Sequence, residues 1–309
     1  MIKYPEYKHG EIVIIDKEYA NSSKVKVISQ TQPSRIYTTV EDLETGYRWD
    51  KGLLREVNED SILCTSFDLR THLGLVSAGL FAVADGMGGH NAGEVASDIA
   101  IRTLHVKCIA GLLAPSPTPP LSVLAAAFNK ANRQVLNAAS DRALEGMGTT
   151  LTAALVIDGD LYVAHIGDSR CYIINTRETI QVTKDHSVVQ QLVDEGTITA
   201  KQARNHPRRN EITRVLGYSH DIVPDLHHLK LYAGDNILLC SDGLHGMLTS
   251  EKISETVTGS HDPNQTCIDL TAQANLAGGP DNISVIIARP GSLPSWQAMV
   301  TAQTGIGRI

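Results

Sequence analysis

The sequence predicts an α+β protein in which antiparallel sheets are flanked by helices. Strand-like segments follow one another across short turns over residues 149–183, as antiparallel hairpins do. Helical patterns occur in pairs between groups of strands, whereas a doubly wound parallel sheet would alternate them singly. With 309 residues, 42% of them hydrophobic and 20% charged, the chain can bury the core of one large domain or two smaller ones.

Residues 1–50 differ from the rest of the chain. Short alternating runs (GEIVIID, SKVKVIS and SRIYTTVED) predict strands, and LETG before YRWD predicts a hairpin turn. Five of the nine tyrosines and one of the two tryptophans lie here, so the aromatic side chains either bind a partner or pad the edge of the main fold. We predict a small β-rich extension or module over 1–50 and leave both roles open.

From residue 51 the pattern mixes strands and helices. Asn91 followed by Glu94 resembles a capping box that opens a helix, and the proline-rich stretch 114–120 predicts a connector before a second amphipathic helix. The polar stretch 185–217, rich in histidine and arginine, predicts a helical excursion. Further strands are predicted over 62–64, 73–84, 236–240 and 283–288, and further helices over 250–257 and 264–277.

Composition argues against several classes of partner. The 27 Lys and Arg against 34 Asp and Glu give a formal charge of −7, so bulk electrostatics favour neither nucleic acid nor a membrane surface. Five scattered cysteines without a C-x-x-C pair predict reduced thiols and a cytoplasmic setting. The N-terminus lacks the basic and apolar pattern of a signal peptide. The sequence does not define the oligomeric state, and we favour a monomer.

Acidic residues recur at the ends of predicted strands. Asp85, Asp168, Asp242 and Asp281 each stand beside such an end and a small or turn residue, and Glu59–Asp60 precede the strand at 62. Each alone is typical of a turn, but the set can converge at one end of a sandwich. Converging carboxylates repel unless cations bind between them, and hard oxygen ligands favour Mg²⁺ or Mn²⁺.

A phosphate-binding glycine loop is the alternative for residues 84–97. Gly88 and Gly93 have the spacing of a P-loop, but Glu94 stands where that loop requires lysine. Cys240 and Ser241 are the candidate nucleophiles for a phosphoenzyme, but the absence of a C-x5-R loop after them argues against a cysteine phosphatase.

Together the motifs resemble one family. They run in order as GLLREVNEDS, ADGMGGHNAGEVAS, GTTLTAALV, HIGDSRCY, TKDHSVVQQLVDEGTIT, NHPRRNEITRVLG, LLCSDGL and GGPDNISVII, over residues 51–290. This series is similar to the metal-dependent Ser/Thr protein phosphatases, the protein phosphatase 2C-like (PPM) group, in their bacterial form. Residues 1–50 and the tail 291–309 lie outside the resemblance.

The resemblance implies a β-sandwich of two antiparallel sheets between helices, in four layers, with a two-metal Mn²⁺ or Mg²⁺ centre at one edge. It implies a mobile flap over 185–217 beside that centre. Carried over by position, it implies these roles: Asp85 bridging two metals, the Gly86 carbonyl on one of them, Asp242 and Asp281 on the other, Glu59 and Asp60 on metal-bound waters, Asp168 at a weaker third metal, and Arg55 on the substrate phosphate.

Two departures from the family pattern affect these roles. Met87 replaces a histidine that is a proposed general acid in many members, so the proton donor to the leaving group is unassigned. Gly246 stands where an acid usually supports the third metal, which weakens that position. His90, His186 and His206 are candidates for proton carriers or for capping and packing of the flap.

The resemblance implies hydrolysis of phosphoserine and phosphothreonine in proteins by a metal-bridged water, in opposition to a Ser/Thr kinase. Phosphorylated proteins would be the substrates, and a kinase and its targets the partners. Two alternatives stay open: a pseudophosphatase that acts as a regulatory binding module, and a phosphoesterase for a small phosphate ester.

Overall fold

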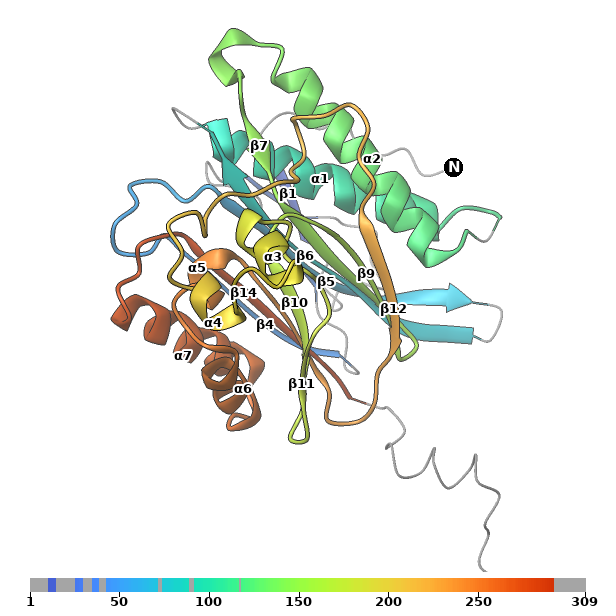
Figure 1. Ribbon diagram of the computed structural model, residues 1–309. Coiled ribbons are helices and arrows are strands. Elements are labelled where there is room, and N and C mark those ends of the chain that lie inside the picture. The colour runs from blue at the N-terminus through green and yellow to red at the C-terminus, as the bar shows by residue number, and fades with distance from the viewer. Residues whose placement is uncertain are drawn as a thin grey trace, which may run out of the picture.

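The protein is a sandwich of two β-sheets covered by helices on both outer faces (Figure 1). The computed structural model describes residues 11–14, 26–29, 35–38, 43–71, 74–88, 92–116 and 118–291. The predicted four-layer α-β-β-α arrangement is therefore confirmed. The one parallel pairing among the described strands joins β3 to β5.

The seven-stranded sheet has its strands in the order β12-β9-β8-β6-β5-β3, with β7 paired to β6. Its strands are β3 (Arg35–Thr38), β5 (Asp60–Thr71), β6 (Gly74–Met87), β7 (Gly148–Thr149), β8 (Leu151–Ile157), β9 (Asp160–Ile166) and β12 (Asp225–Lys230). The long hairpin of β5 and β6 forms its centre and brings Asp60 opposite Asp85.

The five-stranded sheet has the order β11-β10-β13-β14-β4. Its strands are β4 (Leu43–Asp50), β10 (Arg170–Ile174), β11 (Thr179–Gln181), β13 (Asn236–Cys240) and β14 (Ile283–Pro290). The strands β1 (Glu11–Ile14) and β2 (Lys26–Ser29) pair only with each other among the described residues.

The predicted hairpin turn at LETG is wrong, because these residues lie within the continuous strand β4. This strand pairs with β14 along its whole length, from Leu43 opposite Pro290 to Asp50 opposite Ile283. Gly46 is a glycine for reasons of packing, since a Cβ there would collide with the backbone of Pro263 at the start of α7. The predicted division at residue 50 stays a prediction, although β4 lies on its N-terminal side.

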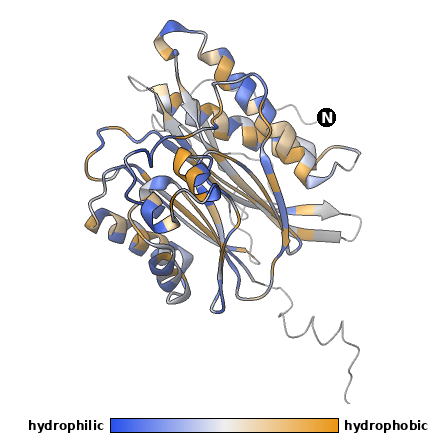
Figure 2. Ribbon diagram, in the orientation of Figure 1, coloured by the Kyte–Doolittle hydropathy of each residue, from blue (hydrophilic) through white to orange (hydrophobic). Residues whose placement is uncertain are grey.

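Helices cover both outer faces of the sandwich (Figures 1 and 2). The seven-stranded sheet is covered by α1 (Ala92–Leu112) and α2 (Pro120–Ala138), joined by the predicted connector, and a 3-10 turn (Arg142–Leu144) follows α2. The five-stranded sheet is covered by α5 (Asp242–His245), α6 (Ser250–Thr258) and α7 (Pro263–Leu276). The segment 185–217 carries α3 (Val188–Asp194) and α4 (Ala200–Ala203).

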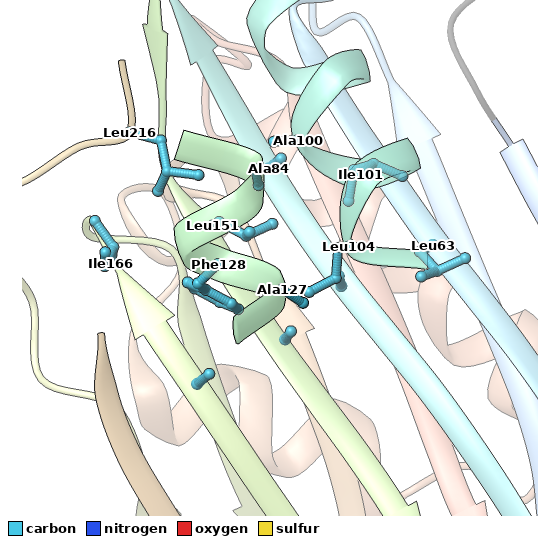
Figure 3. Packing of buried hydrophobic residues seen from close by; sticks show 14 of the residues in the cluster. Leu63, Ala84, Ala100, Ile101, Leu104, Ala127, Phe128, Leu151, Ile166 and Leu216 are labelled. Atoms are coloured by element: carbon cyan, nitrogen blue, oxygen red, sulfur yellow. The ribbon is translucent and has the colours of Figure 1, made fainter. Parts of the chain in front are cut away.

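Three buried apolar layers hold the sandwich together. The first joins α1 and α2 to the seven-stranded sheet, where Leu104 and Phe128 pack against Leu63 and Leu151 (Figure 3). The second lies between the sheets, and the third lies under α5, α6 and α7. Because each fully buried leucine or phenylalanine contributes about 1.5–3 kcal/mol, these layers fix the positions of the strand ends that carry the acids. No helix in the described part of the chain has the length and apolarity needed to cross a bilayer.

Candidate metal centre

The predicted acids lie at one edge of the sandwich. Antiparallel neighbours alternate in direction, so the start of β5 meets the end of β6, and the end of β13 meets the starts of β10 and β14. Asp60 begins β5 and Asp85 lies near the end of β6. Asp168 precedes β10, Asp242 follows β13, and Asp281 precedes β14.

Asp60 is the most firmly held of these acids. Its side chain is buried, and its Oδ2 accepts hydrogen bonds from the hydroxyls of Ser241 (2.8 Å) and Ser284 (2.7 Å). Its Oδ1 is buried without a hydrogen-bond partner. Burial, with the carboxylates of Asp242 and Asp281 nearby, raises the pKa of Asp60 to about 7.

Asp85 and Asp242 share this electrostatic environment. Burial, followed by the charges of Asp60 and Asp242, raises the pKa of Asp85 well above its ordinary value. Burial and the charge of Asp281 raise the pKa of Asp242 to about 6. Oδ1 of Asp242 is also buried and unpartnered. In each case the protein disfavours the ionised carboxyl, which a bound cation would reverse.

Asp168 lies on the turn between β9 and β10 and is almost fully buried. Its Oδ1 lacks a partner, while its backbone carbonyl lies 3.0 Å from Nε2 of buried His245. Burial and the charges of Asp242 and Asp185 raise the pKa of Asp168. Gly246, which offers no side-chain oxygen, follows His245 at the exposed end of α5.

Arg55 lies between two of the acids. Its Nη2 is 2.8 Å from Oδ2 of Asp281, and its Nη1 is 3.6 Å from Oε2 of Glu59. The arginine side chain is 46% exposed, so its guanidinium is accessible to a ligand. Burial raises the pKa of Glu59 despite the opposing effect of Arg55.

Gly86 lies in the last residues of β6, directly after Asp85. Its N–H donates to the Glu59 carbonyl at 3.2 Å, and a Cβ at this position would collide with the Gly93 carbonyl. Only glycine therefore fits at this position, where the backbone passes close to Gly93 and Glu59 directly after Asp85.

The donor set fits hard divalent cations. Three buried carboxylate oxygens, on Asp60, Asp168 and Asp242, have no hydrogen-bond donor. Among the described residues, no three His, Cys, Asp or Glu side chains are grouped as a complete ligand shell. Backbone carbonyls and water would supply the other oxygens, as is usual for Mg²⁺.

Two of the three candidate histidines, His186 and His206, make contacts that support the packing of the flap. Nδ1 of His186 accepts the Gly167 N–H at 3.0 Å, and its Nε2 faces Asp225 at 3.1 Å. Nδ1 of His206 accepts the N–H of Arg208 within the flap. His90 lies outside the described residues.

Both ends of the flap are attached beside the acids. The His186 N–H donates to the Gly167 carbonyl at 2.7 Å, next to Asp168. Leu216 exchanges two backbone hydrogen bonds with Thr149, whose hydroxyl donates to the Asp85 carbonyl. At the neck of the flap, Ser187 and Ile212 form an antiparallel bridge.

Sequence reasoning missed the residues that support the acids. Ser241 was considered only as a nucleophile, yet with Ser284 it holds Asp60. Oδ1 of Asn282 accepts the Glu59 N–H at 2.8 Å and so ties the loop before β5 to Asp281. A polar residue next to a strand-end acid, as in CSDG and PDNIS, is the signal that could have identified them.

Comparisons with known proteins agree with this geometry. Residues 58–278 match the family model described as protein phosphatase 2C. The serine/threonine protein phosphatase PstP of Mycobacterium tuberculosis is 41% identical over 243 residues, which are 78% of this chain and 44% of that protein. The chain thus spans less than half the length of PstP. The Listeria monocytogenes serine/threonine phosphatase stp is 35% identical over 244 residues, 78% of this chain and 93% of that protein.

Solved structures show the same fold. The crystal structure of M. tuberculosis PstP/Ppp has a TM-score of 0.71 at 39% identity, covering 81% of this chain and 99% of that one. The PstP catalytic domain in complex with 2 manganese ions has a TM-score of 0.69 at 38% identity, with the same coverage. The matches span most of the chain at more than 30% identity, so the chain belongs to the protein phosphatase 2C family.

Proposed function

We propose that this protein hydrolyses phosphoserine and phosphothreonine in phosphorylated proteins, and that it opposes a Ser/Thr kinase. The observation that carries the proposal is the convergence of Asp60, Asp85, Asp168 and Asp242 beside an accessible arginine, with three carboxylate oxygens left without donors. The family membership and the PstP complex with manganese support the same reaction.

The residues divide the work between metal binding and phosphate binding. Asp85, the Gly86 carbonyl, Asp242 and Asp281 would hold two Mn²⁺ or Mg²⁺ ions, and Asp168 a weaker third. Bound divalent ions acidify water and offset charge on phosphoryl oxygens.

The side chains around the metals would position the water and the phosphate. Arg55 would bind two phosphate oxygens through its planar guanidinium. Oδ1 of Asp60 would accept a hydrogen bond from water, while Ser241 and Ser284 fix its Oδ2. Glu59 would orient Arg55 and a second water.

A cytoplasmic setting and a monomeric state are part of the proposal. All five cysteines are free and buried, as expected in a reducing compartment. The kinase and its targets would be the partners.

Phosphate release from a phosphothreonine peptide tests the reaction. We expect release with Mn²⁺, none with EDTA, and slower release from a matched phosphotyrosine peptide. Mn²⁺ binding without turnover would instead favour a pseudophosphatase. Hydrolysis of p-nitrophenyl phosphate but of no peptide would favour a small phosphate ester as substrate.

A further inference from the structure

Two leucines lie exposed directly before the phosphate-binding arginine. Leu53 is 64% exposed and Leu54 is 72% exposed. Single exposed apolar side chains are common on protein surfaces. Within the described ranges, however, these two are the only large hydrophobic residues with this exposure that are adjacent in the sequence. We call Leu53 and Leu54 the leucine pair.

The loop that carries the leucine pair is clamped at both ends. Nδ2 of Asn282 donates to the carbonyls of Lys51 (2.9 Å) and Val57 (3.0 Å), which flank the loop. Inside the loop, the Leu53 N–H donates to the Gly279 carbonyl at 2.8 Å. The leucine pair is therefore held in place rather than exposed by fraying.

Contact with the candidate metal centre fixes the loop further. Gly52 has φ +75°, and a Cβ there would collide with the Asp281 carbonyl. The Gly52 N–H donates to Oδ1 of Asp50 at 2.9 Å. The same short loop thus connects the leucine pair to Arg55, which contacts Asp281 by its side chain.

We propose that the leucine pair is a specificity surface for the phosphoprotein chain, and that it binds an apolar side chain flanking the phosphorylated serine or threonine. The inference rests on the proposed function. A phosphate bound by Arg55 brings its flanking residues close to the same loop, because Leu53 and Leu54 directly precede Arg55 in the sequence. Two fixed leucines favour an apolar neighbour over a charged or hydrated one.

Peptide selectivity measures the effect. Two phosphothreonine peptides carry either leucine or serine at both positions next to the phosphothreonine, and p-nitrophenyl phosphate serves as a substrate without flanking residues. For the wild-type protein with Mn²⁺, we expect kcat/KM to be about tenfold higher for the leucine-flanked peptide. The variant Leu53→Ser/Leu54→Ser should remove this preference and lower the peptide-to-aryl-phosphate ratio of kcat/KM.

Leu113→Ser is the matched control. Leu113 is 63% exposed and directly follows α1. The start of this helix lies near the acids, and its 21 residues are about 30 Å long, so Leu113 lies far from them. It should keep the wild-type selectivity. An undiminished preference for leucine in the double variant would overturn the inference and leave the proposed function intact.

Two other outcomes would also overturn it. A wild-type dimer that becomes monomeric on size exclusion only in the double variant would make the leucine pair a contact between two copies. A wild-type protein that hydrolyses neither peptide nor p-nitrophenyl phosphate would overturn the proposed function, and the inference with it.

Discussion

At the scale of single residues, the acid cluster is balanced by few opposite charges. Arg55 contacts Asp281 and Glu59, but Asp60, Asp168 and Asp242 each keep a buried oxygen without a donor. Such oxygens destabilise a folded protein unless a proton or a cation occupies them. The pKa of Asp60 and of Asp242 is accordingly raised.

Asp242→Asn tests a single ligand. The amide keeps the size of the side chain but removes the charge, so we expect Mn²⁺ affinity to fall at least about tenfold and kcat roughly 100-fold. Without metal, the melting temperature should stay the same or rise, because repulsion with Asp85 and Asp281 is relieved. Calorimetric titration and thermal unfolding measure both effects. Exposed Glu145→Gln is the control for charge, and unchanged Mn²⁺ affinity in Asp242→Asn would contradict the assignment.

His165 gives a prediction about pH. Its ring is buried 2.9 Å from the Thr152 hydroxyl and stacks on His186, and burial is the first cause that lowers its pKa to about 3. In the unfolded chain His165 therefore becomes protonated near pH 6.5, whereas in the folded chain it stays neutral down to about pH 3. Stability should fall on acidification across this window, by about 1.4 kcal/mol per pH unit below pH 6 for this group.

His165→Gln isolates this contribution. The free energy of unfolding can be measured in urea at several pH values between 6.5 and 4.5. In the variant it should fall less steeply with decreasing pH than in the wild type, by about 1.4 kcal/mol per pH unit, which corresponds to the uptake of one proton. Parallel pH dependences for the two proteins would show that His165 does not make this contribution.

At the scale of elements, β4 depends on a close approach to α7. The backbone of Gly46 faces that of Pro263 and Asn264 without room for a Cβ. Gly46→Ala must push the strand and the helix apart, and we expect it to lower the free energy of unfolding by about 3 kcal/mol in urea.

Gly234→Ala is the companion variant. Gly234 has φ +92°, and a Cβ there would meet no atom within 4 Å. Gly234→Ala should lower the free energy of unfolding by only about 1 kcal/mol, which is the penalty for placing a side chain in the left-handed region. Equal losses in the two variants would argue against the packing explanation for Gly46.

Elements were predicted well where the pattern is local. The amphipathic pattern after the proline-rich stretch predicted α2, whose buried face includes Leu124, Phe128 and Val135. The strand-like segments over 149–183 predicted β8 and β9. Gly46 in LETG led to the wrong prediction of a turn, because the residue that requires a glycine there, Pro263, is 217 residues away in the chain. The acids were found because strand ends are visible in sequence. Their supports were not, because Ser241 and Ser284 reach Asp60 across 181 and 224 residues.

At the scale of the whole molecule, metal and stability should be linked. Ions that bind only the folded state add stability, by about 2.7 kcal/mol at one hundred times the Kd. Mn²⁺ should therefore raise the melting temperature above its value in EDTA, and the increase should grow with concentration. Choline chloride at equal ionic strength controls for screening. A melting temperature independent of Mn²⁺ would contradict binding at the acid edge.

The neck of the flap has a consequence for protein engineering. Residues 186–188 and 211–213 are joined by the Ser187–Ile212 bridge and by backbone hydrogen bonds from Val188 to Glu211 and from Thr213 to His186. The intervening stretch leaves and re-enters the sandwich at one place. We expect that this stretch can be exchanged as a cassette while the backbone bonds to Gly167 and Thr149 hold the acid edge in place. Under the proposed function, the substrate range could then change without a change in the metal centre.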